Sequence, residues 1–78
     1  MLQKKRALVL TFDATVQAMA AEKYCLAQGL PGRLIPVPRE ITAGCGLAWK
    51  AAPADETRLT QALTAAGILW SGVYVLDI

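Results

Sequence analysis

A single cysteine flanked by two glycines is the feature of this sequence best suited to chemistry. Cys45 stands between Gly44 and Gly46, at the end of a segment that begins at Pro36. This segment is longer than the connections of about 2 to 6 residues that are usual in small domains. Glycine readily adopts a positive φ, which leaves the sulfur unshielded by neighbouring side chains. Backbone N–H groups in such a turn can converge on an anion such as a thiolate or a persulfide. We therefore predict an accessible, reactive thiol at Cys45.

Two polar residues of the same segment are candidates for supporting this anion. Arg39 can supply a positive charge and the hydroxyl of Thr42 can donate a hydrogen bond, and both effects favour a thiolate. Together with Gly44 and Gly46, they form the predicted anion-binding set around Cys45. The alternative is purely structural. The glycines would then make only a turn or bulge, and Arg39 would belong to an exposed ion pair that contributes little.

The residue types that are missing exclude several mechanisms. The chain has no histidine, so no imidazole is present to activate a nucleophile or to bind a metal. Two cysteines, Cys25 and Cys45, are too few for a zinc site of four thiolates. No Walker loop, dinucleotide fingerprint or Cys-x-x-Cys pair occurs. We expect neither a metal nor a cofactor.

The pattern of apolar residues predicts four strands and two helices. Short apolar runs with β-branched and aromatic members predict strands at 7–12, 33–37, 47–51 and 72–76. Helix formers predict a first helix over 14–28, ended by Gly29, and a second over 53–66, ended by Gly67. Asp13 or Thr15 is expected to cap the first helix.

The first helix has one face of small residues that is suited to lying close on a sheet. This face consists of Ala14, Ala18, Ala21 and Cys25. A cysteine in such a position is expected to be a buried small hydrophobe. The opposite side, with Val16, Met19 and Leu26, is not cleanly polar, so the sequence leaves the orientation of this helix open.

The order of the predicted elements is β-α-β-β-α-β. This order is typical of α+β, ferredoxin-like domains, in which two helices cover one face of an antiparallel sheet. Pro36 and Pro38 lack an N–H and therefore favour an edge position for the second strand. The 78 residues are enough for one domain, 1–78, and their 55% hydrophobic content argues against disorder.

Charge and hydropathy exclude two classes of partner and favour one cellular setting. A net charge of +2 gives little reason to expect a nucleic acid. No apolar stretch approaches about 18 residues, so no membrane span is expected. Asp13 interrupts the apolar run after the basic N-terminus too early for a signal peptide. We therefore expect a cytoplasmic protein with free thiols.

The stretch from Leu34 to Ala48 resembles the signature of the selenium/sulfur (Se/S) carrier protein-like family of small, single-domain bacterial proteins. That signature is Pro-x-Pro-Arg, then a Ser or Thr, then Gly-Cys-Gly. It is matched by Pro36, Pro38, Arg39, Thr42, Gly44, Cys45 and Gly46. The resemblance extends over most of the chain through Phe12, Ala18, Glu22 and Gly29. Tyr24 and Cys25 depart from the aliphatic residues expected there, which favours a packing role for Cys25.

The resemblance implies that Cys45 holds a sulfane sulfur or a selenium atom, as a persulfide or a selenide. The donor would be a cysteine desulfurase or another Se/S source, and the acceptor a protein such as selenophosphate synthetase. It implies a carrier with a covalently loaded cysteine rather than an enzyme that turns over. Persulfide transfer needs one nucleophilic thiolate, a cradle for the anion and access for a partner's cysteine, and it needs no cofactor.

Other readings of the sequence remain open. The domain can be a non-catalytic module that binds an anion or a partner through the same loop, because this fold hosts many functions. A redox switch between Cys25 and Cys45 requires Cα atoms within about 7 Å. Copper transport is disfavoured because the residues 11–14 contain no sulfur, whereas ferredoxin-like metal carriers resemble Met-x-Cys-x-x-Cys there. Exposed edge strands make a homodimer feasible.

Overall fold

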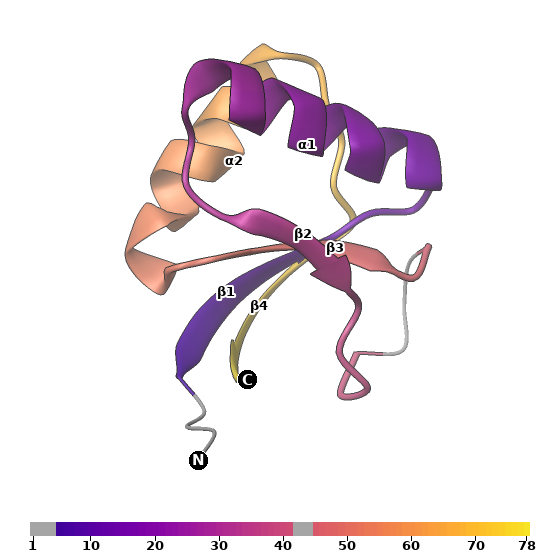
Figure 1. Ribbon diagram of the computed structural model, residues 1–78, viewed down its shortest axis with the longest axis vertical. Coiled ribbons are helices and arrows are strands. Elements are labelled where there is room, and N and C mark those ends of the chain that lie inside the picture. Colours follow the sequence, from indigo (N-terminus) through magenta and orange to yellow (C-terminus); the bar gives the residue numbers. More distant parts are fainter. Residues whose placement is uncertain (1–4, 42–44) are drawn as a thin grey trace.

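One antiparallel sheet with two helices on one face forms the architecture of the described part of the chain (Figure 1). The computed structural model describes residues 5–41 and 45–78. The elements are, in order, β1 (Arg6–Thr11), α1 (Thr15–Gln28), β2 (Arg33–Pro36), β3 (Leu47–Ala51), the 3-10 turn η1 (Pro53–Asp55), α2 (Glu56–Ala65) and β4 (Gly72–Asp77). The strand order within these residues is β2-β3-β1-β4, and all neighbours are antiparallel. The predicted α+β, ferredoxin-like fold is confirmed.

The central strand β1 is buried on both faces, which explains its continuous apolar run. Leu8 and Leu10 point to the helices, whereas Val9 points to the opposite face, as the alternation of a strand requires. The main core lies between the sheet and the helices. Its buried members are Leu8, Leu10, Phe12, Ala18, Ala21, Cys25, Trp49, Ala51, Leu59, Leu63 and Ile68.

The structure settles the orientation of α1. Ala18, Ala21 and Cys25 face the sheet, and their small size lets the helix lie close to it. The opposite side is exposed, so that 70% of Val16, 58% of Met19 and 70% of Leu26 are accessible to solvent.

The two ends of α1 test the sequence predictions in opposite ways. Gly29 ends the helix with φ of +66°, as predicted, and the N–H of Leu30 bonds the carbonyl of Cys25 at 2.9 Å. The predicted cap at Asp13 or Thr15 is wrong. Ala14 occupies the N-cap position with an extended backbone and without a side-chain hydrogen bond. The same position leaves Ala14 exposed and off the buried face.

A second, smaller core lies on the face of the sheet opposite the helices. Ile41, from the connection between β2 and β3, is only 5% exposed and joins the buried Val9 and Ala48 there. Partly buried side chains surround this group, namely Ile35, Val37, Tyr74, Leu76 and Ile78. The segment after Pro36 therefore has a structural role, because one of its residues, Ile41, covers part of the sheet.

The strands β1 and β4 continue their pairing beyond their ends. The N–H of Lys5 bonds the carbonyl of Ile78 at 3.1 Å, and the N–H of Ile78 bonds the carbonyl of Lys5 at 3.0 Å. Both residues lie at the end of the sheet where β1 begins and β4 ends. None of the helices described is long and apolar enough to cross a membrane.

Candidate functional site

Cys45 is held by main-chain hydrogen bonds at the place where β1 ends and β3 is about to begin. Its N–H donates to the carbonyl of Phe12 at 2.9 Å. At the base of the same hairpin loop, the N–H of Val37 donates to the carbonyl of Gly46 at 2.9 Å. These two bonds fix the backbone on both sides of the sulfur. Cys45 is therefore tied through its backbone to the residue that follows β1.

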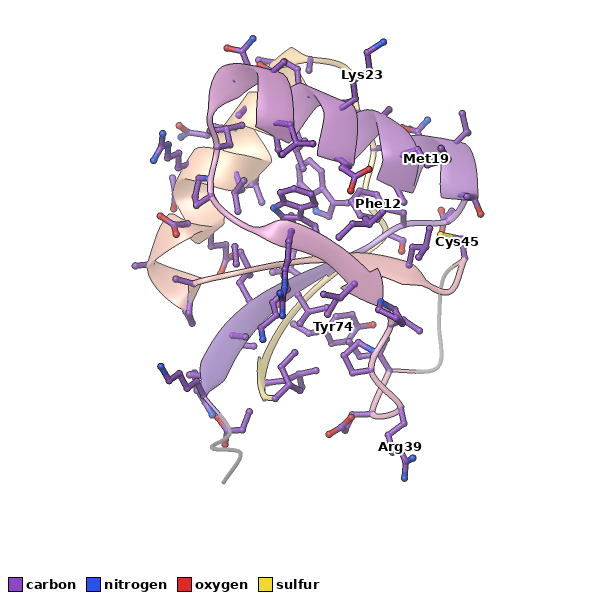
Figure 2. The ribbon with its side chains drawn as sticks, in the orientation of Figure 1. Phe12, Met19, Lys23, Arg39, Cys45 and Tyr74 are labelled. Atoms are coloured by element: carbon purple, nitrogen blue, oxygen red, sulfur yellow. The ribbon has the colours of Figure 1, made fainter. Side chains whose placement is uncertain are left out.

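The bond to Phe12 also places Cys45 beside the first turn of α1. Phe12 comes three residues before Thr15, where the helix begins. Figure 2 shows Cys45 under this end of the helix, with Phe12 and Met19 nearby. The first turn contains no acidic residue and its N-cap contributes no side-chain bond. The backbone of Cys45 is therefore joined to the segment that leads into the positive end of α1.

The sulfur of Cys45 is half-buried, which is less open than the flanking glycines predict. The residue packs against the edge of the main core. Its Sγ lies 3.9 Å from the carbonyl oxygen of Leu47, to which the thiol donates a long, weak hydrogen bond. On the other side, Gly46 is exposed and has φ of +91°, so no side chain covers the sulfur from that position.

The two cysteines have different environments. Cys25 has 0% of its surface exposed, and this burial raises the pKa of its thiol because the core disfavours a thiolate. Both thiols are free. Cys45 is tied to the start of α1, whereas Cys25 lies 10 residues beyond Thr15, or about 15 Å along the helix. That separation excludes a disulfide between them in this fold, because a disulfide needs Cα atoms within about 7 Å.

The predicted anion-binding set is only partly brought together. Gly46 adjoins Cys45 in the chain and in space. Arg39 is exposed at the tip of the hairpin loop, and Figure 2 shows its side chain pointing away from Cys45. Thr42 and Gly44 lie outside the described residues. A direct contribution of Arg39 to the anion would require the loop to change its path.

The sequence analysis missed the main-chain anchor of the site. The carbonyl of Phe12 positions Cys45, yet every residue type offers a carbonyl, so no sequence signal could have revealed this bond. It named Met19 only as part of the less polar side of the first helix, and the exposed Met19 lies on the same side of the molecule as Cys45 in Figure 2. Within residues 5–41 and 45–78, no group of three His, Cys, Asp or Glu side chains is placed to hold a metal ion.

Comparison with known families identifies the chain. Residues 7–75 match the family described as "Putative Se/S carrier protein-like". The chain belongs to this family. The match covers the Se/S carrier-like signature around Cys45 as well as both helices and most of the sheet, so the resemblance predicted from residues 34–48 is confirmed over most of the chain. No curated protein and no solved structure matches it.

Proposed function

We propose that this Se/S carrier-like protein holds one sulfur or selenium atom on Cys45 and passes it between partner proteins. The observation that carries the proposal is the contrast between its two thiols. Cys25 is buried in the core, whereas Cys45 is partly accessible and is held through its N–H by Phe12, just before α1. A carrier needs such a thiol, because a partner's cysteine must reach it. The family description points to the same chemistry.

Loading is a thiol exchange in which atoms and electrons balance. The thiolate of Cys45 attacks the terminal sulfur of a donor persulfide. The S–S bond of the donor breaks, a new S–S bond forms on Cys45, and the donor cysteine leaves as a thiolate that takes up a proton. Delivery repeats the exchange, with an acceptor nucleophile attacking the terminal sulfur and Cys45 leaving. A terminal selenium atom follows the same course, and no external oxidant or reductant is consumed.

The N–H of Cys45 bonds the carbonyl of Phe12, three residues before α1 begins, so the backbone at the site leads into the positive end of that helix. On Cys45, an added sulfur extends beyond the half-buried Sγ. The exposed Gly46 leaves room for it. We propose a cysteine desulfurase or another Se/S source as the donor, selenophosphate synthetase or another protein as the acceptor, and the cytoplasm as the setting.

Mass spectrometry after incubation with a cysteine desulfurase, its pyridoxal phosphate and cysteine or selenocysteine tests the proposal. We expect the protein to gain the mass of one sulfur or selenium atom, mapped to the peptide that contains Cys45. Cys45→Ser should abolish the gain, and Cys25→Ala is the matched control that should keep it. A gain confined to Cys25, or no gain while the desulfurase turns over, overturns the proposal.

The alternative, a module that binds an anion or a partner without covalent chemistry, gives a different result in the same experiment. Under that reading the Cys45→Ser protein binds its partner as well as the unmodified protein does, and neither protein gains mass. Because serine replaces a half-buried thiol with a group of similar size, the variant should remain folded.

A further inference from the structure

A basic groove lies at the end of the sheet opposite Cys45. It has a volume of about 440 Å³ and is formed where β1 and β2 begin and β3 ends. Its lining residues include four cationic side chains and one carboxylate, namely Lys5, Arg6, Arg33, Lys50 and Asp55. In Figure 1, β1 begins at the lower left, whereas Figure 2, in the same orientation, shows Cys45 at the right. The length of β1, about 20 Å, separates the groove from Cys45.

The charge of this groove is out of proportion to that of the whole molecule. Four of the eight basic residues of the chain line it with one carboxylate, Asp55, and one of the four, Arg6, is already paired with Asp77. The chain as a whole has a net charge of only +2, which leaves the remainder slightly acidic. Positive charge gathered in one concave place focuses the electric field and attracts anions.

Two of these cations lie directly opposite each other on neighbouring strands. Arg33 on β2 and Lys50 on β3 are paired in register, and in such a pair the Cβ atoms are about 4.5 to 5.5 Å apart. Like charges in this arrangement repel each other. Within the described residues the recorded ion pair joins Arg6 to Asp77 at 3.4 Å, and neither Arg33 nor Lys50 has such a partner. An anion placed between them would relieve this repulsion.

The turn that leads into β2 packs closely against Trp49. The indole Nε1 of Trp49 donates to the carbonyl of Pro31 at 3.0 Å, and Trp49 itself is buried in the main core. Gly32 has φ of +112°, and a side chain there would collide with Trp49. These contacts tie the backbone just before Arg33 to the core beneath the groove.

We infer that this groove binds a small molecule bearing phosphate groups. Several adjacent cations in a site of this size suit a ligand with at least two negative charges, because each phosphate accepts charge-assisted hydrogen bonds from arginine and lysine. A nucleic acid fits less well. Among the residues that the structure describes, no aromatic side chain lines the groove to stack on a base. The inference does not depend on the function proposed for Cys45.

Titration of the ¹⁵N-labelled protein with pyrophosphate, followed by amide chemical shifts at constant ionic strength, tests the inference. We expect saturable shifts centred on residues 5–7, 32–33 and 50–52. The double variant Arg33→Gln/Lys50→Gln should bind pyrophosphate at least about tenfold more weakly, since each lost ionic hydrogen bond is worth more than a factor of ten. Lys23→Gln/Arg58→Gln removes the same charge from the two helices and should bind normally.

Three outcomes would overturn the inference. One is the absence of saturable shifts in the wild-type protein, and another is an equal loss of affinity in the two double variants, which would mean a response to net charge alone. The third is tight binding of a single-stranded oligonucleotide in a parallel titration with only weak binding of pyrophosphate, which would assign the groove to nucleic acid. The amide spectrum of each variant shows directly whether it is folded.

Discussion

Raising the pH is expected to weaken the fold through Cys25, whose thiol is completely buried. Burial raises the pKa of this thiol, whereas in the unfolded chain it ionises near its ordinary value of about 8.5. The folded protein therefore keeps a proton that the unfolded chain has lost. The full stability is present below about pH 8.5, and it is lost progressively as the pH rises from there through the higher pKa of the folded state.

The size of the effect follows from one proton. While Cys25 stays protonated in the core, each pH unit above the unfolded pKa lowers the free energy of unfolding by about 1.4 kcal/mol. A loss of about 1.4 kcal/mol is the most that one pH unit above the unfolded pKa produces through this thiol, because the loss ends once the pH passes the raised pKa of the folded state. That is a large part of the stability of a small domain, which begins at about 5 kcal/mol.

Urea unfolding at several pH values, followed by tryptophan fluorescence in the presence of a reductant, measures this loss. Cys25→Ala is the comparison, since every other titrating group remains in both proteins. The variant is expected to be less stable near neutral pH, because it leaves a small cavity, but to lose less stability as the pH rises. If the two proteins lose stability in parallel between about pH 7.5 and 9.5, the burial of Cys25 as a neutral thiol is refuted.

Three further predictions concern other parts of the molecule. Alkylation of the native protein should be at least about 100-fold faster at Cys45 than at Cys25, because Cys25 reacts only when the core opens; peptide mapping by mass spectrometry measures this, and equal rates would contradict it. Gly32→Ala should lower the free energy of unfolding by about 2 kcal/mol or more, through its positive φ and a collision with Trp49. An unchanged Tm would be the contrary result. Lys50→Gln should raise the free energy of unfolding by about 0.2 to 1 kcal/mol at low salt, by relieving repulsion across the sheet. Urea titrations should show this gain shrinking in high salt, and a gain independent of salt would exclude charge as its cause.

The sequence predicted the elements well because their signals are local. Apolar runs bounded by turn residues placed a strand at 47–51, where the structure has β3, and one at 72–76, inside β4. The cap of α1 could not be predicted in this way. Asp13 and Thr15 both have capping side chains, but the path of the backbone out of β1 decides which residue lies at the N-cap, and it puts Ala14 there.

The surroundings of the candidate thiol were harder to predict because they depend on contacts between distant residues. The Gly-Cys-Gly pattern was enough to single out Cys45. The path of the hairpin loop, however, is set by Ile41, which packs on Val9 and Ala48 across the sheet, and nothing periodic in the loop sequence signals that contact. Because Ile41 turns inward, Arg39 is left at the tip, away from the sulfur.

The pairing of Lys5 with Ile78 has a practical consequence for work with this protein. A tag or tether joined to Lys5 or Ile78 is attached at the end of the sheet where β1 begins, which is opposite Cys45. Immobilisation on a sensor surface through this end therefore presents Cys45 to the solution. The same anchor lies beside Lys5 and Arg6, which line the basic groove. Partners for the proposed sulfur transfer can therefore be screened on an immobilised sample, whereas anion affinities should be measured on untethered protein.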